Sequence, residues 1–215
     1  MAGSINIGLA TGGDARGRQM DDQILFQGQG YTIARTFNAN TLVPYGPAER
    51  PNGNMNYGWI DLRGHPERVG EIPEATKSAG LAKLLRVIAV PVSKVMSGGC
   101  ECAAFDRGLD FDGPRWLVGG FVDVMFIDAE RNVDPQNHVD LAGYILSGIG
   151  ASDTLIIGYE MIIEPLKTFF GRGDCHALML KPQGYGPDEA TAWAAFDYAA
   201  AAAADSLGRD RPAQT

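Results

Sequence analysis

The chain has 215 residues, of which 45% are hydrophobic and 20% charged, and this composition excludes intrinsic disorder and indicates a globular protein. Its net charge of −8 argues against nucleic acid and anionic membrane surfaces as partners, because both bind basic surfaces. Three cysteines in a chain of this length do not make a disulfide scaffold, and no apolar run approaches the roughly 20 residues that cross a bilayer.

The first residues predict a strand followed by a loop. Residues 4–10 alternate polar and apolar side chains, as a half-buried strand does, and residues 11–18 form a glycine-rich loop. That loop lacks the Gly-Lys-Ser/Thr ending of a phosphate-binding loop. Residues 1–8 have neither a basic segment nor a long apolar segment, so we expect no signal peptide and a cytoplasmic location.

Two further strands and a long loop follow. Residues 23–27 and 31–37 read as strands separated by a Gly-Gln-Gly break. Residues 38–56 contain three prolines and predict a long irregular loop. Such a loop is uncommon in a compact domain unless it covers a site or an interface. Residues 57–63 predict another strand.

The middle of the chain predicts one short helix. Leu81, Leu84 and Leu85 recur at helical spacing within a helix expected over residues 74–86. The β-branched residues that follow, 87–95, predict a strand in which Pro91 marks an edge position or a bulge.

The next region predicts the centre of a sheet. Residues 116–128 form the longest strand candidate and are apolar on both faces, whereas residues 129–137 read as a polar loop. Residues 141–149 are apolar and short, so they fit either a strand or a turn of buried helix. Two more strands, 155–164 and 169–181, are joined through a Gly-Arg-Gly-Asp turn.

The C-terminal helix has clear signals at both ends. Pro187 and two acidic residues begin it, an unbroken alanine run occupies residues 199–204, and Gly208 ends it. Its alanines can pack on the chain's own sheet or can serve a subunit interface.

Strands followed by a helix, more strands and a terminal helix predict an α+β fold. We expect a mostly antiparallel sheet, curved or barrel-like because of the 28 glycines, with a short internal helix and a C-terminal helix. A β-sandwich with one packed helix is the alternative. Residues 1–208 are predicted to form a single globular domain, and residues 209–215 a polar tail.

Thiols and one imidazole form the first candidate group. Cys100 and Cys102 would share one face of an extended strand, whereas Cys175 and His176 would point to opposite faces. Three thiolates and an imidazole suit zinc, but the Cys-x-Cys spacing is unusual for such a site. Whether these residues bind metal stays open, since free cysteine is also a common buried residue.

Carboxylates inside apolar strands form the second candidate group. Asp123, Glu160 and Asp61 each lie between hydrophobic residues. A carboxylate on an apolar face must be paired, hydrogen-bonded or protonated, and such groups suit general acid–base work. The alternative for each is a position on the solvent face of its strand, or pairing with an arginine such as Arg35 or Arg63.

The leading hypothesis is therefore a small-molecule-binding protein with an apolar pocket, in which Glu160, Asp123 and His176 would catalyse proton transfer. His176 is chosen because His65 and His138 fall in predicted loops. The cofactor is unknown, and no residue is designated for cofactor or metal binding. The alternative is a non-catalytic, self-assembling or homo-oligomeric structural protein, and a homo-oligomer is expected in either case.

Overall fold

The computed structural model describes residues 22–49, 53, 55–108 and 112–209. The strand predicted over residues 4–10, the loop after it and all but the first residue of the C-terminal tail therefore lie outside the described residues. In chain order the strands are β1 (Gln23–Gly28), β2 (Tyr31–Arg35), β3 (Thr41–Val43), β4 (Ala48–Glu49), β5 (Met55–Asn56), β6 (Val95–Asp106), β7 (Trp116–Phe126), β8 (Ile156–Phe169) and β9 (His176–Gly186). The α-helices are α1 (Pro73–Lys77), α2 (Ala79–Ala89), α3 (Pro135–Ser147) and α4 (Glu189–Gly208), and the 3₁₀ helices are η1 (Pro66–Glu71) and η2 (Ala129–Asn132).

The described strands form a seven-stranded sheet and a separate two-stranded one. The large sheet has the order β1-β2-β8-β9-β7-β6, with β3 pairing to the second half of β8. Its pairings are antiparallel except those of β2 and β3 with β8, which are parallel. The predicted α+β class and mostly antiparallel sheet are confirmed. The sheet is curved but is not closed into a barrel.

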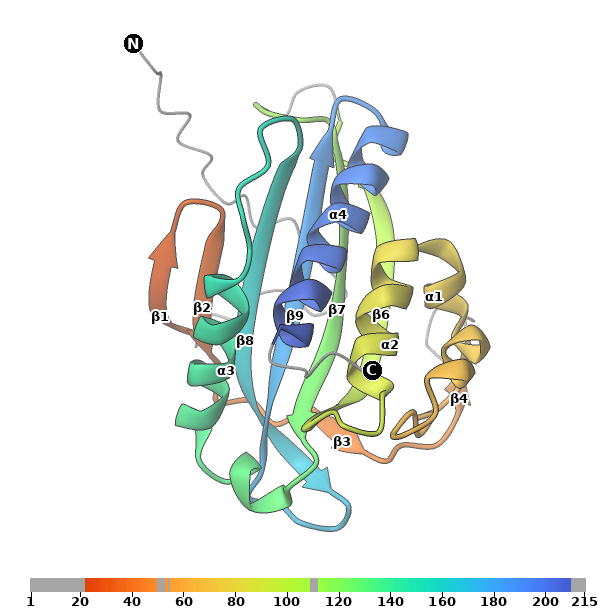
Figure 1. Cartoon of the computed structure of the whole chain (residues 1–215), viewed down its shortest axis with the longest axis vertical. Helices are drawn as coiled ribbons and strands as arrows, with labels where there is room; N and C mark the ends of the chain where they lie inside the picture. Colours follow the sequence, from red (N-terminus) through yellow and green to blue (C-terminus); the bar gives the residue numbers. More distant parts are fainter. Residues whose placement is uncertain (1–21, 50–52, 54, 109–111, 210–215) are drawn as a thin grey trace.

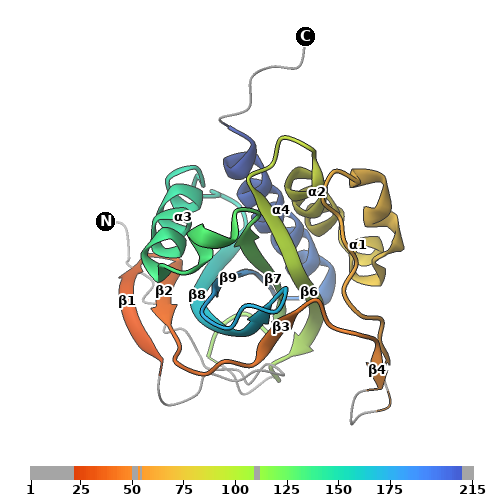
Figure 2. The ribbon, with the colours of Figure 1, turned by 90° about the horizontal axis from the view of Figure 1, so that it is seen from below.

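Helices α2, α3 and α4 lie on one face of the sheet (Figure 1). Seen end-on, the strands arch beneath these helices, and the segment with β3 runs below the arch (Figure 2). We call the two sides the helical face and the concave face. Helices rather than a second large sheet cover the helical face, so the β-sandwich alternative does not hold for the described chain.

Each face has its own hydrophobic core. On the helical face, side chains such as Val122, Leu178 and Phe196 pack between the sheet and the helices. On the concave face, a smaller core forms where β3 crosses, and it comprises Val43, Met96, Met125, Leu166, Phe169, Cys175 and Ala177. Because both faces are buried there, the strands carry long apolar runs instead of a strict alternation.

Helix α4 is seated closely on the sheet and on α2. Its N-cap Asp188 accepts a hydrogen bond of 2.7 Å from the backbone N–H of Thr191. A side chain at Gly184 of β9 or at Gly80 of α2 would overlap the backbone of α4. Six alanines of α4 are fully buried in this seat: Ala192, Ala195, Ala199, Ala200, Ala203 and Ala204. Most of the alanine run therefore packs within the chain's own fold.

Several predicted elements are wrong, and each error has a local cause. Residues 57–63 form no strand, and residues 87–89 continue α2, which ends before a turn that leads to Val95. The predicted loop over 38–56 contains the short strands β3, β4 and β5. The predicted helix over 74–86 is divided into α1 and α2 at Ser78, whose hydroxyl caps α2 by accepting from the N–H of Leu81.

The largest correction is α3. Residues 129–137 were predicted to be a polar loop, yet they form η2 and the start of α3. Asp134 caps α3 by accepting from the N–H of Gln136, and Pro135 occupies its first turn. His138 is consequently a fully buried helix residue instead of a loop residue. The ambiguous apolar stretch that follows belongs to the same helix.

Candidate functional site

The three predicted catalytic residues are divided between the two faces of the sheet. Asp123 and Glu160 belong to the concave face, where they pair across strands with Met179 and Lys181. His176 belongs to the helical face. It follows Cys175 and precedes Ala177, which both pack in the concave core, and strand alternation turns it the other way. The geometry therefore does not bring the histidine together with the two carboxylates.

Glu160 is held in a buried ion pair. Its Oε2 lies 2.7 Å from Nζ of Lys181, and the side chains are only 9% and 11% exposed. Because burial costs a charge its hydration, the proximity of an opposite charge is what makes such a position tolerable. This surrounding gives Glu160 a structural role in the sheet.

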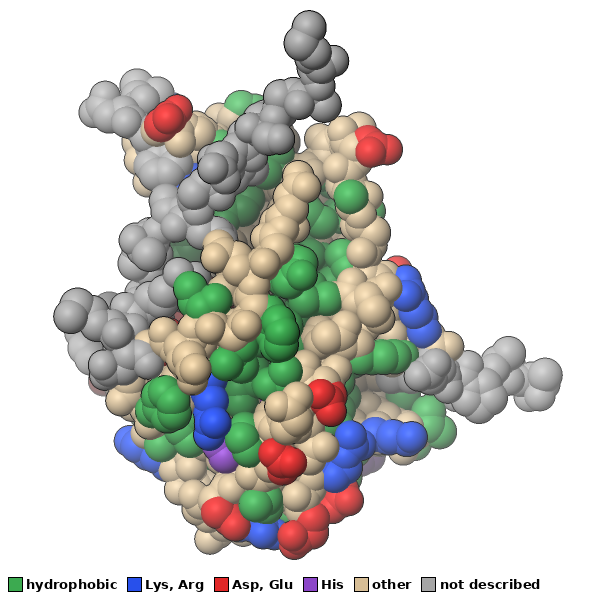
Figure 3. Space-filling model, turned by 90° about the vertical axis from the view of Figure 1, so that its left-hand side faces the viewer, with side chains coloured by type: hydrophobic (Ala, Val, Ile, Leu, Met, Phe, Trp, Pro, Cys, Tyr) green, Lys and Arg blue, Asp and Glu red, His purple; other side chains and the backbone are tan. Residues whose placement is uncertain are grey.

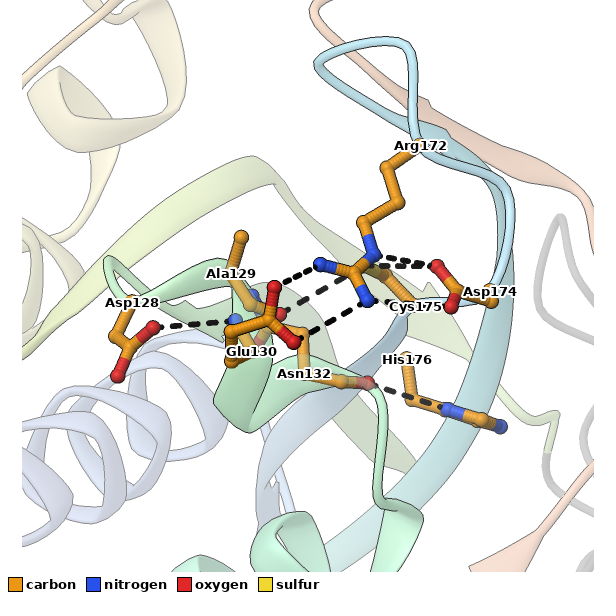
Figure 4. A network of polar contacts seen from close by, with 8 residues as sticks. All are labelled: Asp128, Ala129, Glu130, Asn132, Arg172, Asp174, Cys175 and His176. Atoms are coloured by element: carbon orange, nitrogen blue, oxygen red, sulfur yellow. Dashed lines mark hydrogen bonds and ion pairs between the residues drawn. The ribbon is translucent and has the colours of Figure 1, made fainter.

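His176 lies beside η2 (Figure 4), near the turn between β8 and β9 at the lower end of the molecule in Figure 1. Its Nδ1 is 3.3 Å from the backbone oxygen of Asn132. The side-chain amide of Asn132 accepts from the backbone N–H of Phe126 and donates to the backbone oxygen of Phe126, both at 2.8 Å. Burial lowers the pKa of His176 below its ordinary value. The ring is thus neutral near pH 7 and packed against a structural turn.

The same end of the molecule carries a surface ion network. The guanidinium of Arg172, in the turn between β8 and β9, contacts Glu130 of η2 at 2.5 Å and Asp174 at 2.6 Å (Figure 4). The Gly-Arg-Gly-Asp turn predicted from the sequence is therefore tied to η2 through its arginine. Such exposed pairs orient a loop and contribute little stability.

All three cysteines are free thiols, of which Cys102 and Cys175 are buried and Cys100 is partly buried. Burial raises the pKa of all three thiols, and it raises that of Cys102 to about 12. The Sγ of Cys102 lies 3.8 Å from the backbone oxygen of Glu74, and that of Cys175 lies 3.9 Å from the backbone oxygen of Ala129. Among the described residues, no three His, Cys, Asp or Glu side chains form a group that could hold a metal ion.

A pocket of about 450 Å³ lies between β6 and the segment that follows β2. Its lining comprises Asn40, Thr41, Leu42, Tyr45, Gly46, Ala48, Met55, Asn56, Tyr57, Gly58, Trp59, Ile60, Ile72, Pro73, Glu74, Leu85, Ser97, Gly98, Gly99, Cys100, Phe121 and Asp123. More than half of these residues come from positions 40–60. The long segment predicted to cover a site or an interface therefore forms one wall of this pocket.

The pocket extends past both sides of strand β6. Gly99 pairs with Asp123 on the concave face, whereas Cys100 pairs with Val122 on the helical face. Residues 40–60, which we call the covering segment, also contact both faces, because Trp59 packs on the concave core and Ile60 on the helical core. The space thus has a side bounded by Asp123 and a side bounded by aliphatic residues.

Asp123 is the carboxylate at the concave side of the pocket, and it is 1% exposed. Tyr45 lies beside it, over the bare backbone of Gly99. A Cβ atom at Gly99 would lie 3.2 Å from Oη of Tyr45 and 3.5 Å from Oδ2 of Asp123. The missing side chain at Gly99 is what allows the phenol and the carboxylate to share this place.

The covering segment is fastened at several points. The indole Nε1–H of Trp59 donates to the backbone oxygen of Ser97 at 3.1 Å, and the backbone N–H of Trp59 donates to the backbone oxygen of Tyr45 at 2.9 Å. Gly58 has φ +86, and a Cβ there would lie 2.9 Å from the backbone nitrogen of Pro47. These contacts give the wall a defined shape.

Sequence reasoning found Asp123 but missed its neighbours. Tyr45 and Trp59 reach the pocket through contacts between residues 38 or more positions apart, such as Trp59 with Ser97. The available signal was the length of the segment and its aromatic content. Comparisons with protein-family models, with curated proteins and with solved structures found no match for this chain. Among the described residues, no helix is long and apolar enough to span a membrane.

Proposed function

We propose that this protein binds a small organic molecule in the pocket between β6 and residues 40–60. The observation that carries the proposal is the pocket itself, a space of about 450 Å³ in which one buried carboxylate adjoins aromatic and aliphatic walls. Ligand sites in proteins are typically concave and mostly apolar, with few polar groups to orient the ligand. A cytoplasmic location is part of this proposal and rests on the sequence.

Asp123 is the residue that we propose for acid–base chemistry at this site. It is the member of the predicted catalytic set that lines the pocket. Glu160 is absent from that lining and has Lys181 beside it, whereas His176 belongs to the opposite face. The proposal therefore narrows the predicted set of three to Asp123, with Tyr45 beside it.

An obstructing substitution tests the binding site. Ala48 lines the pocket from an exposed position, so Ala48→Trp should fill its mouth without disturbing a core. Ala151→Trp is the matched control, because Ala151 is also exposed but lies outside the lining. A fragment library is screened by ligand-detected NMR against the wild type and both variants.

We expect fragments that bind the wild type and Ala151→Trp proteins and fail to bind Ala48→Trp. Fragments that bind all three proteins equally, or a library without any binder, would contradict the proposed site. Where a bound compound is turned over, Asp123→Asn should lower the rate by about a hundredfold or more, which is the usual contribution of a positioned acid–base group.

One observation favours a second function, self-assembly into a homo-oligomer. Strand β1 ends the large sheet in the described part of the chain, and its Ile24 and Phe26 are 52% and 56% exposed. Figure 3 faces this side and shows hydrophobic side chains along the middle of the view, with charged side chains mostly below them. A terminal strand with apolar side chains is a place where two sheets can pair.

A further inference from the structure

The charges around the pocket have one sign. Among the described residues that line it, the carboxylic acids are Glu74 and Asp123, and none is Lys, Arg or His. An anionic ligand would therefore meet two carboxylates and no cationic side chain from this lining. A cation would meet the opposite charge that a carboxylate favours.

Aromatic rings line the same space. They belong to Tyr45, Tyr57, Trp59 and Phe121, and the face of an aromatic ring attracts a cation. The chain already uses this attraction next to the pocket, because the guanidinium of Arg63 lies 5.8 Å from the centre of the Trp59 ring and 5.0 Å from that of Phe170. The rings and the carboxylates thus favour the same kind of ligand group.

The other side of the pocket is aliphatic. Ile60, Ile72 and Leu85 line it, and all three belong to the core of the helical face or pack against it. Burying an apolar group there is favourable because it removes apolar surface from water. A ligand that fills both sides needs a charged end and an apolar end.

We propose that the ligand is an amphipathic organic cation, in which a primary ammonium lies near Asp123 and Tyr45 and an apolar group lies toward Ile60 and Leu85. This proposal rests on the proposed function, since it names the ligand class of the same pocket. The protein's net charge of −8 adds a favourable long-range field for a cation.

Three probes of matched shape and different charge test the ligand class: 2-phenylethylammonium, 2-phenylethanol and 3-phenylpropanoate. Their dissociation constants for the full chain are measured at pH 7 by ligand-detected NMR titration at low salt. A probe counts as bound in the pocket when it binds the wild type and not Ala48→Trp. We expect the ammonium to bind about tenfold or more tighter than the alcohol, because a charge-assisted hydrogen bond exceeds a neutral one. The carboxylate should bind more weakly than the alcohol.

The role of Asp123 is tested by Asp123→Asn, which keeps the shape of the side chain and removes its charge. We expect it to weaken the ammonium about tenfold and to change the affinity of the alcohol less than about twofold. Asp153→Asn, at an exposed position outside the lining, controls for the change in net charge. Glu74→Gln is the second variant, and it replaces Asp123→Asn in the test if that protein does not fold. It should also weaken binding of the ammonium.

The outcomes separate the two proposals. The inference is supported if the wild type prefers the ammonium, if Asp123→Asn or Glu74→Gln removes this preference, and if Asp153→Asn keeps it. Binding of the alcohol or the carboxylate in the pocket as tightly as the ammonium overturns the ligand class and leaves the proposed function standing. If Ala48→Trp weakens the binding of none of the probes and the fragment screen gives no binder either, both proposals are overturned.

Discussion

At the scale of single residues, similar sequence surroundings lead to different environments. Asp61, Asp123 and Glu160 each lie between hydrophobic neighbours. Asp61 pairs with Arg63 at 2.7 Å, and this hydrogen-bonded arginine lowers its pKa. Glu160 pairs with Lys181, and Asp123 lines a pocket. For Glu160 and Asp123 the deciding neighbours, Lys181 and Tyr45, come from distant parts of the chain, so the local sequence does not distinguish the three carboxylates.

His138 makes the stability of the protein depend on pH. It is fully buried, its ring centre lies 5.2 Å from that of Phe126, and burial lowers its pKa from 6.5 to about 4. The charges of His176 and Arg131 also lower this pKa, whereas a hydrogen bond with the backbone of His176 opposes the shift. Since the unfolded chain takes up this proton first, the contribution is complete above pH 6.5 and is lost as the pH falls from 6.5 toward 4.

We therefore expect the free energy of unfolding to fall by about 2 kcal/mol between pH 7 and pH 5 through His138 alone. Urea denaturation at the two pH values measures this fall, and His138→Gln should reduce it because the replacement does not titrate. An equal pH dependence in the variant would show that His138 does not carry the effect. The shift of His176 has the same sign, so some pH dependence should remain.

At the scale of elements, helix caps and small residues explain the successes and failures of the sequence predictions. The α4 signals, an acidic start, an alanine run and Gly208, are all local, and the helix was predicted almost to its ends. For α3, the N-cap Asp134 and Pro135 were present in a polar stretch, but the apolar residues follow only later. Periodicity read from the apolar residues alone therefore missed its first turns.

Two helical glycines provide a matched test of how closely the elements pack. A methyl group at Gly80 of α2 would overlap the backbone of Asp197 in α4, whereas one at Gly143 of α3 would meet nothing within 4 Å. Gly80→Ala should destabilise the protein by about 1–3 kcal/mol because α2 and α4 must separate. Gly143→Ala should stabilise it by about 0.5–1 kcal/mol, since alanine favours the helix.

Urea denaturation of both variants at neutral pH measures the two effects. Ser78 and the backbone N–H of Gly80 also bond the carboxylate of Asp197, at 2.5 and 3.0 Å, so a displaced α2 would lose these contacts too. Equal effects of the two substitutions would mean that the contact of α2 with α4 is not tight.

At the scale of the whole molecule, the pocket and the exposed strand β1 lie at opposite ends of the strand order of the large sheet. The pocket lies against β6, and β1 ends the other side of the sheet in the described chain. Ligand binding at one end and self-association at the other are therefore compatible, and each can be tested without disturbing the other.

If β1 joins copies of the chain, replacing its exposed apolar side chains by lysine should separate them. We expect the double variant Ile24→Lys, Phe26→Lys to be monomeric where the wild type is oligomeric, because buried lysines would oppose strand pairing. Val92→Lys is the control, as Val92 is 60% exposed in the turn after α2. Mass photometry and size-exclusion chromatography with light scattering give the masses, and a monomeric wild type would contradict this assembly.

Properties that depend on neighbouring residues could be predicted from the sequence. These are the α+β class, the two long strands β8 and β9, the terminal helix and the opposite directions of Cys175 and His176. Strand alternation and helix caps act over a few residues, so a single chain reveals them.

Which face of each strand is buried, and which residues share a site, depends on contacts between distant parts of the chain. Cys175 packs in the concave core and Leu178 in the helical core, because both faces of the sheet are covered there. Tyr45, Trp59, Gly99 and Asp123 meet because the segment after β2 crosses the sheet to β6. The physical reason is that burial and charge depend on every atom nearby, and most of those atoms belong to distant parts of the chain.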